Sequence, residues 1–313
     1  MDSLSRRRFL RTSTILAAGA CGLASGEGST PRPHISFPTV PRERLSVTSW
    51  PFRAYMESPQ NRDRDPKKPG IAMTEFAAMV ANRFNVHNIN PCSWHFASTQ
   101  PSYIAKFRQS VERARSHVVD LSAGGGGFYD PDAQKRKEAV DYGIKWIDIA
   151  VEIGSPSIRP QIDEPQHLTP NVDRAAQTFG ALADYGARKN IVINLENDDP
   201  TTEDPFFIAK VIDKTGNPYL RALPDFGNSA VKGPAFNTQA LTVMFQHAYS
   251  MSHMKDEAQN DRDQVFHVNV PQAFAIAKAA GYRGYFSMEY DMDYGDPFSA
   301  THRLVEETLK YLG

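Results

Sequence analysis

The sequence contains only two cysteines, Cys21 and Cys92, in 313 residues. Two thiols are too few for a disulfide framework or for a structural zinc site built on several cysteines. No run of 18 or more apolar residues is present, which excludes an ordinary membrane-spanning helix. Neither charge is in excess, because 35 Lys and Arg balance 36 Asp and Glu. A nearly neutral chain lacks the basic footprint of a nucleic-acid-binding protein, so we expect no nucleic-acid partner.

What the chain does contain is typical of a protein with a packed core. Hydrophobic residues make up 41% of the sequence and aromatic residues 11%. This composition argues against disordered and collagen-like chains. The length allows one large domain or two ordinary ones.

The N-terminus has the layout of an export signal. Residues 5–10 (SRRRFL) are basic and lead into a short, weakly apolar stretch of small residues. The adjacent arginines resemble a twin-arginine signal, which would direct the folded protein to the periplasm or the cell surface. We therefore interpret 1–26 as a signal peptide and the segment 27–44, rich in Pro and Ser, as a linker. Cys21 could carry a lipid, which would be the only attachment to a membrane.

From Leu45 onward, short apolar runs alternate with segments of helical periodicity. The predicted strands are 45–50, 86–91, 117–122, 157–162, 191–196, 220–225, 249–253 and 284–289. The predicted helices are 74–84, 101–115, 132–153, 173–189, 204–214, 238–247, 271–280 and 297–312. Eight such units predict an α/β fold, a (β/α)8 TIM barrel over 45–313. The main rival is a doubly wound sheet, but the sequence lacks its glycine fingerprint. A short extra strand could lie near His267.

Four consecutive predicted strands each end with a side chain that can bind a metal. These are Glu196, Asp225, His253 and Glu289, which are 29, 28 and 36 residues apart. In a barrel the carboxyl ends of the strands meet at one rim. Three carboxylates there would repel one another unless a cation joined them. Oxygen ligands with one nitrogen predict one divalent ion, most favourably Mn²⁺, with Mg²⁺, Co²⁺ or Zn²⁺ as alternatives.

The motifs around these residues resemble the xylose isomerase-like TIM-barrel family. The motifs are 194–197 (NLEN), 225–228 (DFGN), 253–256 (HMKD) and 287–289 (SME). The family includes sugar (phosphate) isomerases and epimerases and relatives of endonuclease IV, the AP endonuclease family 2. The resemblance implies that the four residues bind one divalent metal. In the ketose epimerases of the family, the two glutamates also act as acid and base on either face of the substrate. By that resemblance, Glu196 and Glu289 are the catalytic residues.

Two positions depart from the ketose 3-epimerases of this family. Those enzymes have a histidine where this chain has Asn228 and an arginine where it has Gln259. Both family residues hold the substrate, so their absence argues against epimerisation of a free ketohexose. The departures leave the metal site and the two glutamates unchanged.

Further polar and aromatic residues follow the predicted strands at the same rim. We expect five of them to contact the substrate: Trp50, Trp94, His95, Arg159 and Lys255. The tryptophans could stack on a sugar ring, and the others could donate hydrogen bonds to its oxygens. Rim packing is the alternative for the two tryptophans.

These observations favour an exported, divalent-metal-dependent sugar isomerase or epimerase. It would work by proton transfer through an enediolate, and its partner is a small carbohydrate. The first alternative is a lyase or hydratase that acts on a keto-sugar or a 3-keto-glycoside. A nuclease like endonuclease IV and a non-catalytic sugar-binding barrel are weaker alternatives. The sequence leaves open whether the chain forms a homo-oligomer.

Overall fold

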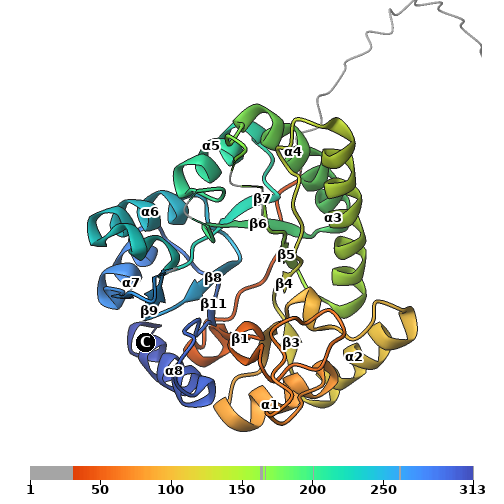
Figure 1. Ribbon diagram of the computed structural model, residues 1–313, viewed down its shortest axis with the longest axis vertical. Coiled ribbons are helices and arrows are strands. Elements are labelled where there is room, and N and C mark those ends of the chain that lie inside the picture. Colours follow the sequence, from red (N-terminus) through yellow and green to blue (C-terminus); the bar gives the residue numbers. More distant parts are fainter. Residues whose placement is uncertain (1–30, 163–164, 166, 200, 261, 313) are drawn as a thin grey trace, which may run out of the picture.

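The computed structural model describes residues 31–162, 165, 167–199, 201–260 and 262–312. Strands occupy the centre, and the helices surround them in chain order (Figure 1). The expected signal peptide, 1–26, and Cys21 lie outside the described residues. Within the described ranges, no helix is both long and apolar enough to cross a membrane.

Nine short strands build the barrel wall among the described residues. They are β1 (Leu45–Thr48), β2 (Asn88–Asn90), β3 (His117–Val118), β4 (Leu121–Ser122), β5 (Ser157–Arg159), β6 (Val192–Glu196), β7 (Leu220–Leu223), β8 (Met251–Met254) and β11 (Tyr285–Met288). All their pairings are parallel, in the orders β3-β2-β1-β11-β8 and β4-β5-β6-β7. Both β3 and β4 lie in the predicted strand 117–122. Single bridges between Cys92 and Ser122 and between Asp225 and His253 join the two sheets into a closed barrel.

Eight helices cover the outside of this wall. They are α1 (Met73–Phe84), α2 (Pro101–Arg113), α3 (Ala133–Ile153), α4 (Val172–Lys189), α5 (Pro205–Thr215), α6 (Pro234–His247), α7 (Val270–Ala279) and α8 (Pro297–Leu312). Their ends carry local signals. Asp204 accepts hydrogen bonds from the first backbone N–H groups of α5, and Gly216 ends that helix with a φ of 62°. All eight predicted strand–helix units are present, which confirms the TIM barrel.

Along the strands, residues alternate between an apolar outer layer and a polar interior. Outward residues such as Val47, Ile89 and Ile193 pack under the helices in one large core. Inward residues include Asn90 and Asp120, which lie on neighbouring segments of the wall and form a hydrogen bond with each other. Barrel interiors are usually filled by Val, Ile and Leu. This interior is instead a hydrogen-bonded polar layer directly beneath the rim where the predicted metal ligands lie.

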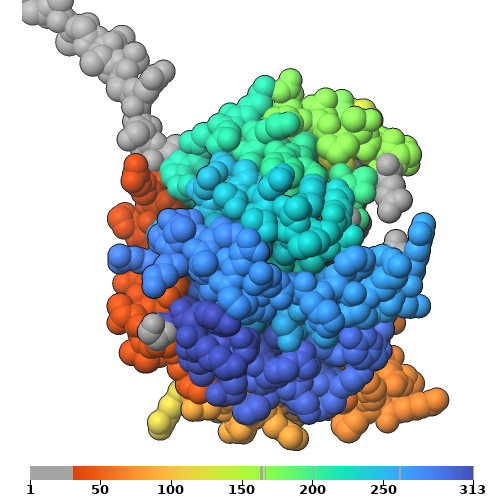
Figure 2. Space-filling model, turned by 90° about the vertical axis from the view of Figure 1, so that its left-hand side faces the viewer, coloured from red at the N-terminus to blue at the C-terminus, as the bar shows by residue number. Residues whose placement is uncertain are grey.

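Residues 31–44, from the segment expected to be a linker, pack against the base of the barrel. The Phe37 ring meets the rings of Tyr249 and Tyr285 edge-on, with centroids 5.3 and 5.8 Å apart. The Tyr249 hydroxyl donates to the carbonyl of Pro33 at 3.0 Å. Figure 2 shows the red N-terminal residues along the left-hand edge of the space-filling view. The segment thus lies at the amino ends of β8 and β11, opposite the predicted metal ligands.

A hairpin follows β8 at the other end of the barrel. Its strands are β9 (Glu257–Gln259) and β10 (Val265–His267), which pair antiparallel. It contains the extra strand expected near His267, and it contacts the 3-10 helix η4 (Asn228–Lys232), which follows Asp225. The hairpin therefore adds to the wall around the rim.

Candidate metal centre

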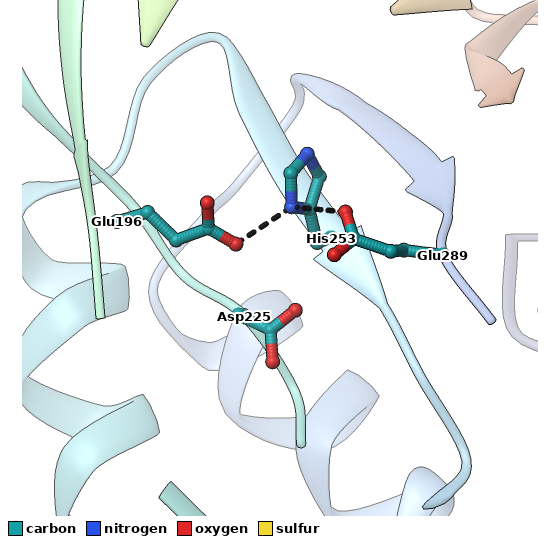
Figure 3. Close-up of side chains that lie close together, drawn as sticks. All are labelled: Glu196, Asp225, His253 and Glu289. Carbon is teal, nitrogen blue, oxygen red and sulfur yellow. Dashed lines mark hydrogen bonds and ion pairs between the residues drawn. The ribbon is translucent and has the colours of Figure 1, made fainter. Parts of the chain in front are cut away.

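The four predicted ligands meet at the carboxyl ends of four neighbouring strands. Glu196 ends β6, Asp225 follows β7, His253 lies in β8 and Glu289 follows β11. One ligand atom of each residue lies within 4.8 Å of those of the other three. Relative exposure is 6% for Glu289 and 2% or less for the others. Figure 3 shows the three carboxylates grouped around the imidazole.

His253 presents its two ring nitrogens to different partners. Nδ1 lies 2.7 Å from Oε1 of Glu196 and 2.8 Å from Oε2 of Glu289. Nε2 lies 2.9 Å from Oδ1 of Asn90 on the side away from the carboxylates. Burial alone would lower the pKa of His253, but the two glutamates hold it well above its usual value. A proton on Nδ1 therefore occupies the place between the carboxylates that a metal ion would take.

Asp225 has one oxygen fixed by the backbone and one oxygen left over. Oδ1 accepts hydrogen bonds from the N–H groups of Gly227 at 2.8 Å and Asn228 at 2.7 Å. Oδ2 is buried and accepts no hydrogen bond from the residues described in the structure. Burial raises the pKa of Asp225 to about 7. Burying a carboxylate oxygen without a hydrogen-bond donor costs free energy. A divalent cation bound to this oxygen would offset that cost.

The Lys255 ammonium group lies beside the cluster and is itself buried. Its Nζ is 3.5 Å from Asp225 Oδ2 and 3.2 Å from Oε1 of Glu289. It also donates to Oδ1 of Asn228 at 2.8 Å and to Oδ2 of Asp291 at 3.2 Å. Burial lowers the pKa of Lys255, but the carboxylates around it raise it well above its usual value. The lysine is therefore a fixed positive charge at the centre.

Arg159, at the end of β5, contacts the other glutamate. Its Nε lies 2.8 Å from Oε2 of Glu196, and one terminal nitrogen lies 3.5 Å from Oδ2 of Asp198. Burial raises the pKa of both glutamates, but cations outweigh it. Arg159 and His253 lower that of Glu196, while His253 and Lys255 lower that of Glu289. Both glutamates are therefore ionised near neutral pH.

A cavity of about 250 Å³ opens beside Glu289. Its walls include Trp50, Trp94, Arg159, Gln161, Asp198 and Asp291. The two tryptophan rings meet edge-on, with centroids 6.1 Å apart. Nε1 of Trp50 donates a hydrogen bond to Asp291, which fixes one ring of this wall. Three of the five expected substrate contacts, Trp50, Trp94 and Arg159, thus line one pocket next to the cluster.

His95 lies elsewhere, although it follows Trp94 directly. It is fully buried and is not among the described residues that line the pocket. Its Nδ1 lies 2.8 Å from the hydroxyl oxygen of Ser49, which also accepts a hydrogen bond from the N–H of Cys92. Burial lowers the pKa of His95 to about 3. These contacts place His95 in the packing behind the pocket wall.

Sequence reasoning did not single out several polar residues of the site. Asp198 and Asp291 lie in loops two residues beyond Glu196 and Glu289, where alternation along the strand no longer predicts a direction. Asn90 ends β2, so the reasoning that identified the four ligands from their places at strand ends applies to it as well. An amide is a weaker signal than a carboxylate or an imidazole, however, because it more often forms an ordinary hydrogen bond.

Comparison with solved structures relates the geometry to known proteins. A xylose isomerase-like TIM barrel protein from Mycobacterium smegmatis, in complex with magnesium, matches with a TM-score of 0.66 and 15% identity over 86% of this chain and 96% of that one. The 3-keto-D-glucoside 4-epimerase from E. coli matches with a TM-score of 0.62 and 14% identity over 86% and 98%. A D-psicose 3-epimerase from Clostridium cellulolyticum, solved with D-tagatose, matches with a TM-score of 0.61 and 10% identity over 86% and 96%.

At such identities these structures show the shared fold. No curated protein sequence matches the chain. The model of one sequence family, described as xylose isomerase-like TIM barrel, matches residues 80–312, which is most of the chain. Together with the barrel and its four converging ligand side chains, this match shows that the chain belongs to the xylose isomerase-like TIM barrel family.

Proposed function

We propose that the protein is a divalent-metal-dependent sugar isomerase or epimerase that uses Glu196 and Glu289 as proton-transfer groups. The single observation that carries this proposal is the buried cluster of three carboxylates and one imidazole, one of which, Glu289, lines a pocket. The oxygen-rich donor set and the unsatisfied Oδ2 of Asp225 both fit Mn²⁺ or Mg²⁺. The magnesium complex of the Mycobacterium smegmatis relative supports the same class of ion.

The bound ion would polarise a sugar carbonyl and so acidify the adjacent C–H group. Glu196 and Glu289, on strands separated by those of Asp225 and His253, would face the substrate from two sides. Their lowered pKa values keep both ready to accept a proton. The Lys255 ammonium group, 3.2 Å from Glu289, would hold this carboxylate in its ionised form. Delivery of a proton to the opposite face, by the other glutamate in its protonated form, would invert the carbon. Return of the removed proton to the neighbouring carbon would isomerise the sugar.

We further propose that the substrate is an uncharged sugar. Arg159 is already paired with Glu196 and Asp198, and Lys255 is paired with three carboxylates. Among the pocket's lining residues, Asp198, Glu289 and Asp291 leave an excess of negative charge, which disfavours a phosphate. Acidic oxygens and tryptophan faces suit hydroxyl groups and the apolar face of a sugar ring. The named activities of the two epimerases above support this class.

The test is a substrate screen of the metal-loaded protein in D₂O. The panel contains free ketoses, aldoses, 3-keto-glycosides and phosphate esters of the same sugars, and the metal is chelated before ¹H NMR. We expect deuterium at a carbon next to the carbonyl of an unphosphorylated sugar, together with a new stereoisomer or isomer. Loss of a substituent from the β-carbon would instead identify a lyase. Absence of exchange across the whole panel would contradict the proposed chemistry.

We also propose that the protein acts outside the cytoplasm, on the basis of the sequence at 5–10 alone. Replacing Arg6 and Arg7 together by lysine should leave unprocessed protein in the cytoplasm, because twin-arginine signals depend on that pair. The measurement is fractionation followed by immunoblotting, with Arg11→Lys as the matched control. Export of the double variant at the rate of the unchanged chain would contradict the proposal.

A further inference from the structure

A chain of hydrogen bonds connects the candidate metal centre to a carboxylate buried in the middle of the barrel. Nε2 of His253 faces Oδ1 of Asn90 at 2.9 Å. The amide nitrogen of Asn90 donates to Oδ2 of Asp120 at 3.1 Å. Asp120 and Asn90 are both fully buried, and neither has a role in the proposed proton transfer. These hydrogen bonds must therefore have a role other than contact with the substrate.

Asp120 is held firmly enough to orient its partner. Its Oδ1 accepts from the Ser157 hydroxyl at 2.6 Å and from the amide of Asn194 at 2.9 Å. Its other oxygen is then left for Asn90. Because a carboxylate without its proton can only accept, it decides which end of the Asn90 amide faces it. The NH₂ group turns toward Asp120, and the carbonyl oxygen must turn toward His253.

The orientation of the amide in turn decides the state of the imidazole. A carbonyl oxygen can only accept, so Nε2 of His253 must carry a proton and donate it. The lone pair of a neutral ring is then on Nδ1, the nitrogen that lies between Glu196 and Glu289. A histidine ligand needs such a fixed tautomer and ring orientation to bind a metal tightly.

We propose that Asn90 and Asp120 are positioning residues for the metal: they fix the tautomer and the ring plane of His253 so that Nδ1 is the ligand atom. This inference rests on the proposed metal centre and adds two residues to its support. It also accounts for the polar layer in a barrel interior that is usually apolar. An interior of buried polar groups is costly unless it serves specificity or function.

The experiment compares three variants by their affinity for Co²⁺. Asn90→Leu removes the acceptor and keeps the number and branching of the side-chain heavy atoms. Asp120→Asn keeps the shape of the side chain but removes the charge that orients Asn90. Asn88→Leu is the matched control, because Asn88 is buried on the same strand and donates only to the backbone carbonyls of Glu43 and Leu45.

We expect Asn90→Leu to raise the Kd for Co²⁺ about 10- to 100-fold, the range seen for loss of a partner behind a metal-binding histidine. Asp120→Asn should lie at the lower end of that range, and Asn88→Leu should bind Co²⁺ as the unchanged protein does. The second readout is the exchangeable imidazole N–H of His253 in the paramagnetic ¹H NMR spectrum of the Co²⁺ form. A ring held by Asn90 shows this proton, and Asn90→Leu should lose it through fast exchange.

The outcomes separate this inference from the proposal it rests on. If the unchanged protein binds no Co²⁺, the metal centre itself is wrong and the inference falls with it. If that protein binds Co²⁺ and Asn90→Leu binds it within twofold, with the N–H signal retained, only the inference is overturned. Equal weakening by Asn88→Leu would also overturn it, since the effect would then come from general loss of stability. Should Asn90→Leu fail to fold, Asp120→Asn decides by the same two readouts.

Discussion

The two ends of this barrel bury different kinds of side chain: aromatic rings at the base and ionisable groups at the rim. At the base, Phe37 lies against Tyr249 and Tyr285, and the Tyr249 hydroxyl donates a hydrogen bond to the backbone carbonyl of Pro33. At the rim, Asp225 and the other three side chains of the cluster are buried together, and two carboxylate oxygens, Oε2 of Glu196 and Oδ2 of Asp225, accept no hydrogen bond within the described part of the chain. The rim keeps three carboxylates buried close together, an arrangement that a divalent cation would stabilise.

Hydrogen-bonded polar groups continue from the rim into the interior of the barrel. Near the rim, Asn90 and Asp120 extend the charged cluster downward through hydrogen bonds. Beside these polar groups, Leu223 and Met251 pack together with Val119 in a small apolar cluster. Changes at the two ends should therefore separate chemistry from stability.

The largest expected effect belongs to the glutamates at the rim. Glu196→Gln and Glu289→Gln should each lower turnover roughly 10²- to 10⁴-fold at saturating metal, the range typical of general acid–base groups. Sugar affinity should change far less, because the amide keeps the size of the side chain. The measurement is steady-state kinetics with metal occupancy determined for each variant. Exchange of the substrate proton at a near-normal rate in fully loaded variants would show that the carboxylates are ligands only.

At the base, Phe37→Ala should cost stability and spare the site. Loss of two edge-on aromatic contacts, each worth about 0.5–1.5 kcal/mol, predicts a decrease in unfolding free energy of roughly 1–3 kcal/mol. Metal affinity and turnover should remain those of the unchanged protein. Urea unfolding and a metal titration of the same sample provide the check. A clear loss of metal affinity in this variant would contradict the claim that the base affects stability without affecting metal binding at the rim.

A smaller effect concerns His95, which is buried behind the pocket wall with a pKa of about 3. The folded protein keeps this imidazole neutral, whereas the unfolded chain protonates it below its ordinary pKa of 6.5. The contribution of His95 to stability is therefore complete above pH 6.5 and is lost as the pH falls from 6.5 toward 3. The loss is at most about 1.4 kcal/mol per pH unit.

His95→Gln should flatten that part of the pH dependence. The check is the unfolding free energy between pH 4.5 and 7.5 for both proteins. Identical slopes in the two would mean that His95 is protonated in the folded state, contrary to its burial.

Sequence patterns predicted the parts of the molecule that repeat. Alternation of apolar runs and helical segments located all eight units, and the strand-end argument located Glu196, Asp225, His253 and Glu289. The argument works because the barrel brings every strand end to one rim, whatever the details of packing. Lys255 followed from the same reasoning, since it lies two residues beyond His253.

What the patterns did not predict depends on contacts between distant segments. The composition of 27–44 suggested a linker, but Phe37 finds an aromatic site that exists only in the closed barrel. Adjacency to Trp94 suggested that His95 faces the substrate, yet the short 3-10 helix η3 (Ser93–His95) turns its ring to Ser49. The link from Asn90 to His253 joins strands 163 residues apart in the sequence. No local periodicity encodes such a pair.

The central claim is that the four converging side chains hold one divalent ion. Titration of Mn²⁺ into metal-stripped protein by calorimetry, with Asp225→Asn and His253→Ala beside the unchanged chain, tests it most directly. We predict one ion per chain, a rise in Tm on binding, and a loss of affinity in both variants beyond the roughly 10- to 100-fold that an outer partner contributes. Binding of no ion by the unchanged chain, or equal binding by all three proteins, would contradict the account.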